Sequence, residues 1–125
     1  MELIKFVIPK GFRGAFVVEE DPHAGPAPKD SDGAWVYSIG ADGRLRARTV
    51  APFRSWHETI AAYSDGTKIE FSSIGPIEPY KDATVKLRTL FADSDGRHYF
   101  LVGTEEELAD AAKNRAGLEM GGVAQ

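Results

Sequence analysis

The chain has 125 residues, a net charge of −4 and no cysteine, and 42% of its residues are hydrophobic. This length and composition predict one globular domain over residues 1–125 and exclude a disordered or fibrous protein. The acidic balance argues against a nucleic-acid partner, and the lack of cysteine excludes disulfides and Cys-based metal or cluster sites. No apolar stretch reaches the roughly 20 residues that a membrane span needs.

Short strands separated by turns account for most of the chain. Runs of alternating apolar residues, rich in Val, Ile, Phe and Tyr, are typical of strands. Residues 20–33 interrupt these runs with three prolines and no apolar period. They predict a long loop, of a size that is often either functional or mobile. The strands are expected at residues 3–8, 15–19, 34–39, 44–50, 58–63, 68–72, 84–91 and 97–102.

Asp-Gly pairs occur four times, and both residues accept the positive φ that tight turns need. Three of the pairs lie between consecutive predicted strands and therefore predict antiparallel hairpins. Two belong to Asp-Ser-Asp-Gly strings, at 30–33 and 93–96, which resemble part of a calcium loop but lack its further ligands. We expect turns and no metal there. The pairs are Asp32-Gly33, Asp42-Gly43, Asp65-Gly66 and Asp95-Gly96.

One helix is expected near the C-terminus, at about 104–116. Thr104 and Glu107 form a capping-box pattern at its start, and Gly117 is typical of the residue after a helix end. Residues 119–125 are expected to fray. Together the elements predict a mainly β fold, an antiparallel sandwich or partly open barrel of seven or eight strands with one C-terminal α-helix. A pleckstrin-homology-like barrel is the alternative architecture.

The connection between the fourth and fifth predicted strands gathers Phe53, Arg54, Trp56 and His57. Aromatic and Arg side chains dominate the energetics of protein interfaces, so this segment is a candidate recognition loop. Either large aromatic residue could instead fold back and close one end of the core. The sequence leaves both interpretations open.

Arg44, Arg46 and Arg48 alternate along one predicted strand, which places their guanidinium groups on one face. Guanidinium forks suit carboxylates and phosphates, so this stripe is a second candidate binding surface. The alternative is a solvated strand face whose charges are answered by Asp and Glu on neighbouring strands. We favour that alternative because half-exposed strands usually carry charge.

The string Ile8-Pro9-Lys10-Gly11-Phe12-Arg13-Gly14, followed by the Val-rich segment 15–18, is the most distinctive in the sequence. Together with the Asp-Gly hairpin at 39–45 and the Tyr-Phe-Leu-Val-Gly-Thr segment at 99–104, it resembles an uncharacterised bacterial family of small β-rich domains. The resemblance implies a β-rich fold and carries over no catalytic residues, because the family has no established activity. Relatives with this pattern are often exported or lipid-anchored.

No catalytic motif accompanies His23, His57 and His98, and no two of them have metal-ligand spacing. We therefore expect a non-catalytic binding module for a protein or a small polar ligand, without a cofactor, of a bacterial accessory or immunity type. One alternative is a small hydrolase or isomerase that pairs His57 or His98 with a carboxylate in a barrel mouth. Another is a structural oligomer that pairs through a sheet edge. If Met1 is the natural start we expect a cytoplasmic protein, and if a leader was removed, an exported mature domain.

Overall fold

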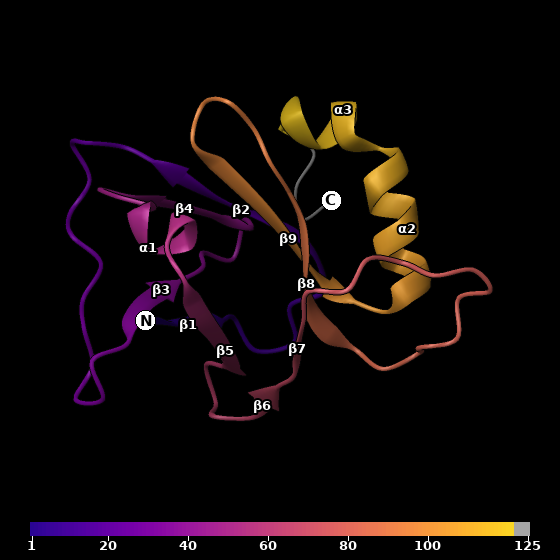
Figure 1. Cartoon of the computed structure of the whole chain (residues 1–125), viewed down its shortest axis with the longest axis horizontal. Coiled ribbons are helices and arrows are strands. Elements are labelled where there is room, and N and C mark those ends of the chain that lie inside the picture. The colour runs from indigo at the N-terminus through magenta and orange to yellow at the C-terminus, as the bar shows by residue number, and fades with distance from the viewer. Residues whose placement is uncertain (122–125) are drawn as a thin grey trace.

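The computed structural model describes residues 1–121 as two stacked β-sheets with a helical layer outside one of them (Figure 1). Sheet A has the strand order β3-β1-β5-β6, and sheet B has the order β4-β2-β9-β8-β7. Only the first three residues of the tail predicted to fray, 119–125, are among the described residues. The elements are β1 (Glu2–Ile8), β2 (Gly14–Glu20), β3 (Trp35–Ser38), β4 (Arg44–Ala47), α1 (Ala51–Arg54), β5 (His57–Tyr63), β6 (Lys68–Ile69), β7 (Phe71–Ser72), β8 (Lys86–Ala92), β9 (Arg97–Gly103), α2 (Glu105–Lys113) and α3 (Arg115–Glu119).

The predicted fold class is confirmed: the chain is mainly β, with two packed sheets and a helical C-terminal region. Within the described residues the strands close no barrel, so the pleckstrin-homology-like alternative is wrong. No helix in this part of the chain is long and apolar enough to cross a membrane.

The Asp-Gly turns form as predicted. All four of their glycines have a positive φ, between +75° and +92°. In both Asp-Ser-Asp-Gly strings the first carboxylate, of Asp30 or Asp93, accepts backbone N–H bonds from two and four residues further on, at 2.9 and 3.0 Å. These carboxylates are therefore engaged in turn formation.

Strand pairing is mixed, whereas the sequence predicted antiparallel pairing. The hairpins β5–β6 and β8–β9 are confirmed, but β1 runs parallel to both β3 and β5, and β2 runs parallel to β4. The turn at Asp42-Gly43 forms, since Gly40 N–H donates to Arg44 O at 3.1 Å, yet β3 then joins sheet A and β4 joins sheet B. The hairpin predicted there is wrong. A turn sequence sets a local reversal, while the choice of sheet depends on which distant apolar side chains pack together.

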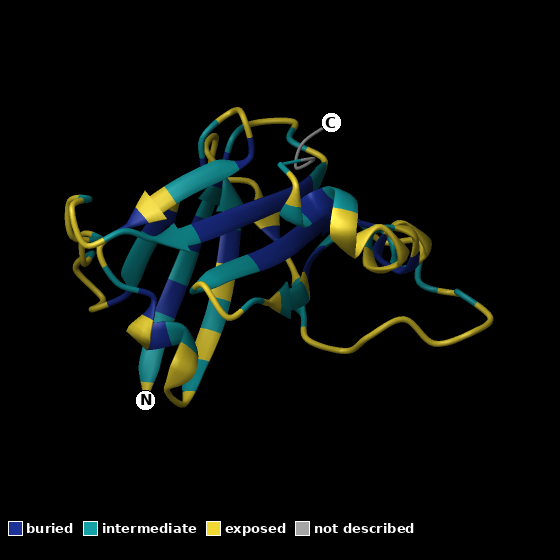
Figure 2. Cartoon of the chain, turned by 90° about the horizontal axis from the view of Figure 1, so that it is seen from above, coloured by how far each residue is buried: buried dark blue, intermediate teal, exposed yellow. Residues whose placement is uncertain are grey.

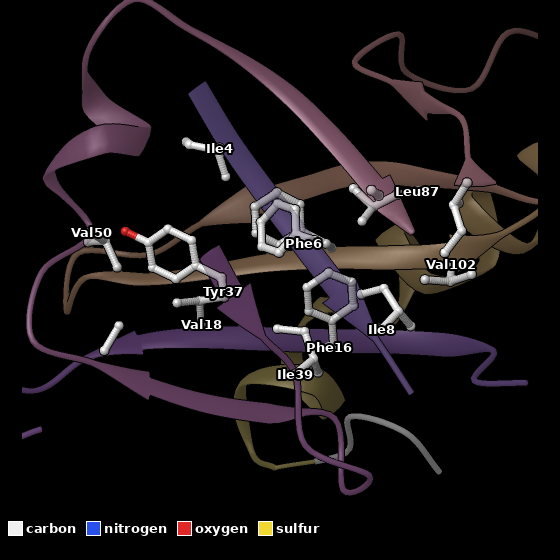
Figure 3. Close-up of a cluster of buried hydrophobic side chains, with 14 residues drawn as sticks. Ile4, Phe6, Ile8, Phe16, Val18, Tyr37, Ile39, Val50, Leu87 and Val102 are labelled. Atoms are coloured by element: carbon white, nitrogen blue, oxygen red, sulfur yellow. The ribbon is translucent and has the colours of Figure 1, made fainter. Parts of the chain in front are cut away.

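The main core lies between the two sheets (Figure 3). Figure 3 shows side chains of β1, β2 and β3 gathered around Phe6, whose ring centroid lies 5.5 Å from that of Phe16 and 4.9 Å from that of Phe100. Such aromatic pairs add about 0.5–1.5 kcal/mol each beyond the burial of their area. Their burial fixes which face of each strand points inward.

Helices α2 and α3 cover the outer face of sheet B. Leu108 of α2 and Leu118 of α3 pack on a second cluster of buried side chains, which includes Val17 of β2 and Tyr99 of β9. Figure 2 shows the buried strand segments in the middle of the molecule and the exposed turns at its periphery. Sheet B is therefore covered on both faces, whereas in residues 1–121 neither face of sheet A has a helical layer.

The helix predicted at about 104–116 is divided at Asn114 into α2 and α3. Its capping box is confirmed: Glu107 Oε1 accepts from the Thr104 N–H at 2.9 Å, and Thr104 Oγ1 accepts from the Glu107 N–H at 3.2 Å. Gly117 lies inside α3, so its assignment as the residue after the helix end is wrong. Asn competes for backbone hydrogen bonds and thus favours a helix end at position 114.

On one lateral side of the sandwich the sheets end in β3 and β4, and the proline-rich loop 21–34 lies over them. Val36 N–H of β3 donates to Pro28 O, and Asp21 N–H donates to Ala47 O of β4, both at 2.8 Å. These bonds give partners to groups that an edge strand would otherwise leave to solvent. We call this side the covered edge.

On the opposite side the chain crosses from sheet A to sheet B between β6 and β7. Strand β6 therefore pairs with β5 only at residues 61–62, and β7 pairs with β8 only at 87–88. Within the described chain, residues 57–60 of β5 and 89–92 of β8 have no outer strand partner. We call these two segments the open edge.

Candidate binding cleft at the open edge

A cleft of about 100 Å³ lies between the two sheets at the open edge. Four phenylalanine rings, two imidazoles and two threonine side chains line it. They come from both sheets and from α1, so the cleft forms only when the sandwich is assembled. The lining residues are Phe6, Phe53, His57, Thr59, Phe71, Thr89, His98 and Phe100.

Strand alternation turns the polar residues of the cleft inward. In β5, His57 and Thr59 share the face of buried Ala61, and in β9, His98 shares the face of buried Phe100. The polar side chains cannot turn outward unless the core residues of the same strand turn out as well. The packing of the core thus holds two imidazoles and a threonine at the end of the gap between the sheets.

The aromatic segment divides between core and surface. Helix α1 places Phe53 against the core, with its ring centroid 4.9 Å from that of Tyr37 and 5.0 Å from that of His98. Trp56, in contrast, is 82% exposed. The core interpretation therefore applies to Phe53, which closes the end of the core. Trp56 remains on the surface next to His57, and its role in recognition stays a prediction.

Two charged side chains, Arg54 and Glu20, pair near His98 with an N–O distance of 3.5 Å. Burial lowers the pKa of His98 from its ordinary value of 6.5, and the charge of Arg54 lowers it further. The pKa of Glu20 is lowered first by the hydrogen bond that it accepts from the Val50 N–H at 3.1 Å. At pH 7 the cleft therefore contains a neutral His98 imidazole, which both donates and accepts hydrogen bonds.

The cleft lacks the His–carboxylate pair of the hydrolase or isomerase alternative. His57 Nδ1 lies 2.7 Å from the backbone oxygen of Ser55, and no carboxylate is among the lining residues. Residues 1–121 hold no group of three or more His, Asp or Glu that could bind a metal ion. In the same residues every buried side-chain N or O atom has a partner, so unpaired polar atoms of the cleft are open to solvent. The arrangement suits recognition through hydrogen bonds and ring contacts.

The arginine stripe lies apart from the cleft. Arg44 and Arg46 both face Glu19, at 3.4 and 3.8 Å, and Arg44 also donates to Gly121 O at 3.0 Å. Arg48 donates to the proline-rich loop at the covered edge. None of these arginines lines the cleft; Glu19 answers the charges of Arg44 and Arg46, and Arg48 is bound to a backbone oxygen.

Five residues of the cleft were not identified as site residues from the sequence, namely Phe6, Thr59, Phe71, Thr89 and Phe100. Phe6 and Phe100 lie on predicted apolar strands and also belong to the core. The signal for the threonines is a polar residue at an inward position: Thr59 precedes the inward Ala61 by two residues, and Thr89 follows the inward Leu87 by two. No sequence signal places Phe71 there, because its position depends on where the chain crosses between the sheets.

No protein-family model and no curated protein sequence matches the chain. Its structure is similar to the crystal structure of a protein from Bacillus anthracis described as a "Putative Lipoprotein". The TM-score is 0.51 at 15% sequence identity, and the match covers 95% of this chain and 92% of that chain. At this identity the likeness shows the fold alone, over nearly the full length of both chains.

Proposed function

We propose that the chain is a non-catalytic binding module that holds one side chain of a protein partner in the cleft at the open edge. The observation that carries the proposal is the lining of the cleft, where aromatic rings lie beside two imidazoles and two threonine side chains. Rings provide apolar contact, and a few convergent polar groups provide orientation, as in most binding pockets.

The size of the cleft favours a side chain over a free small molecule. Its volume of about 100 Å³ is well below the ~300–1,000 Å³ of pockets that enclose whole ligands. A closed cavity of about 150 Å³ holds a whole benzene, so this smaller cleft, which is open to solvent on one side, takes part of one ring-sized side chain. The remainder of the partner would lie outside it, on the surface.

An exposed apolar residue beside the cleft supplies part of that surface. Trp56 is 82% exposed and directly precedes the open half of β5. Tryptophan is among the residues most enriched in the energetic centres of interfaces. Phe53 lies three residues before Trp56 and packs on Tyr37. This contact anchors the segment that carries Trp56 to the core.

We also propose that the module acts outside the cytoplasm, as an accessory protein. Two likenesses support this: the fold is similar to that of a protein described as a lipoprotein, and the opening segment 8–14 resembles that of exported or lipid-anchored relatives. Fractionation of the source cells with an antibody against the chain tests it. The chain is expected in the periplasmic or extracellular fraction, and recovery from the cytoplasm alone would contradict the proposal.

The probe for the cleft is p-cresol, which reproduces the side chain of tyrosine. We expect its addition to shift the NMR signals of His57, Thr59 and His98 along one saturable curve. Thr89→Phe, which fills the cleft, should abolish these shifts, whereas Glu58→Phe adds the same ring on the outer face of β5 and should preserve them. Shifts that spread over the surface without saturation, or that persist in Thr89→Phe, would overturn the proposal.

A further inference from the structure

We propose that the partner segment binds as an added β-strand along residues 57–60 of β5, with one aromatic side chain inserted in the cleft. The inference rests on the proposed function and specifies the chemistry of the partner: an extended backbone that carries a tyrosine-like residue. Three observations support it. The backbone groups of His57 and Thr59 are free on one side, the side chains of these residues line the cleft, and a bulge interrupts β8, the other strand with a free segment.

The free backbone groups of His57 and Thr59 point away from β1. Along a strand, the N–H and C=O of successive residues point to alternate sides. Trp56 O accepts a bond from β1 at 2.9 Å and Ser64 N–H donates to β1 at 2.8 Å, whereas Tyr63 N–H donates to the other side, to the turn after β5, at 2.8 Å. The backbone groups of the even-numbered residues of β5 therefore bind β1. The backbone N–H and C=O of the odd-numbered residues point to the open edge.

Strand β6 reaches these outward groups only as far as Ala61. It then leaves sheet A, so within residues 1–121 no strand pairs with His57 and Thr59 on that side. An unpaired row of backbone donors and acceptors is the template on which extended peptides bind. A shallow hollow of about 280 Å³, lined by residues of β5, β6 and β7, adjoins the cleft and shares Thr59 and Phe71 with it.

A strand added at this edge places one of its residues directly opposite Thr59. The side chains of such a cross-strand pair lie on the same face of the sheet, so the partner residue enters the cleft with Thr59. The lining offers the rings of Phe53 and Phe100 to an aromatic group, and the imidazole of His98 to a polar tip. Tyrosine combines both features, because it has an apolar ring and a hydroxyl group.

Strand β5 is a better template than β8, although both have a free segment. A bulge between Thr89 and Phe91 breaks the register of β8 with β9, and bulges twist an edge away from further pairing. Strand β5 keeps a continuous register with β1 from His57 to Tyr63. An incoming strand therefore extends sheet A, in line with β6.

The test uses random dodecapeptides displayed on phage, selected on the intact chain and eluted with p-cresol. The selected peptides should contain a tyrosine or another aromatic residue flanked by β-branched residues. Thr59→Pro removes the outward N–H and leaves the β1 ladder in place, while Thr59→Val keeps the N–H and the shape of the side chain. Thr59→Pro loses one backbone hydrogen bond to the peptide and disturbs the next one, so peptide binding should weaken about tenfold. Thr59→Val keeps these bonds, so binding should weaken only about twofold.

The outcomes separate this inference from the proposed function. Binding that survives Thr59→Pro, and also survives N-methylation of the peptide at the amide opposite Thr59, overturns strand addition, while saturable p-cresol binding keeps the proposed function. A library without any peptide that p-cresol displaces overturns strand addition, and a lack of saturable p-cresol binding by the intact chain overturns both. A chain that is dimeric by light scattering, and monomeric as Thr59→Pro, assigns the edge to a second copy and overturns the peptide partner. Thermal unfolding of Thr59→Pro close to that of Thr59→Val confirms that the variant stays folded.

Discussion

The covered edge and the open edge end the same two sheets, but the chain closes only the first. At the covered edge, the loop 21–34 forms a bridge between Lys29 and Trp35, and Lys29 Nζ lies 4.4 Å from the centroid of the Trp35 ring. At the open edge, β6 and β7 each pair with only two residues of their seven-residue neighbours. Free strand edges expose a protein to unwanted pairing, and proteins usually cover or blunt them.

The difference separates the two long connections of the chain: one covers a sheet edge, and the other ends beside an edge that stays open. The proline-rich loop, whose length is often a sign of function or mobility, lies over the covered edge. The connection through α1 closes the end of the core with Phe53 and leaves Trp56 exposed. We infer that at the open edge the missing strand comes from outside the chain.

The largest expected effect is on the aromatic residue that closes the core at the open edge. Phe53→Ala removes contacts with Phe6, Tyr37 and Phe100, and should lower the free energy of unfolding by about 3 kcal/mol. Trp56→Ala is its matched control and should change that free energy by less than about 0.5 kcal/mol, because the side chain is exposed. Urea denaturation measures both. Equal losses would contradict the division of this segment between core and surface.

A smaller effect is expected at the covered edge. Asp30→Ala removes the carboxylate that accepts the N–H groups of Asp32 and Ala34, and should lower the free energy of unfolding by about 1 kcal/mol. Limited proteolysis should then cut within residues 21–34 more readily. Ser31→Ala, in the same turn, is the control and should leave the free energy of unfolding and the rate of cleavage close to those of the wild type. Cleavage that is unchanged in Asp30→Ala would show that the turn does not hold the loop.

The smallest expected effect is a dependence of stability on pH that originates at the open edge. Because the pKa of His98 is lower in the folded chain than its ordinary 6.5, the unfolded chain binds more protons between those two values. The free energy of unfolding should therefore fall as the pH drops below about 6.5, until the pKa of the folded state is passed. Burial is the first cause, the charges of Arg54 and His57 also lower the pKa, and Asp93 and Glu20 oppose them.

His98→Gln should flatten this part of the stability profile. An NMR titration of the imidazole should place the pKa of His98 in the folded chain below 6.5. A pKa above that value would reverse the sign of the slope and would show that the nearby carboxylates outweigh burial. His23→Gln, which changes a histidine outside the cleft, is the control for the general effect of losing an imidazole.

Local features of the fold could be predicted from the sequence, and its long-range pairings could not. Asp-Gly turns, the capping box of Thr104 and Glu107, and two hairpins depend on neighbouring residues, and they form as predicted. The parallel pairing of β1 with β3 and β5 depends on apolar side chains that meet across the whole chain. No turn signal encodes such pairing.

The candidate site shows the same limit. The sequence singled out Phe53, Trp56 and His57 as a group because they lie close together in the chain. It also named His98 as a possible partner of a carboxylate, but the approach of His98 to His57 across the gap arises only from the stacking of the two sheets. The free half of β5 results from the point at which the chain leaves β6, which the sequence pattern does not mark.

The most direct test is amide hydrogen exchange at Thr59 and Ala61, measured with and without a selected peptide. In the free chain we predict rapid exchange at Thr59, whose N–H faces the open edge, and protection at Ala61, which pairs with β6. The peptide should slow exchange at Thr59 and leave Ala61 unchanged. A Thr59 amide that is already protected in the free chain, or that the peptide does not slow, would contradict the account of an open edge completed by a partner strand.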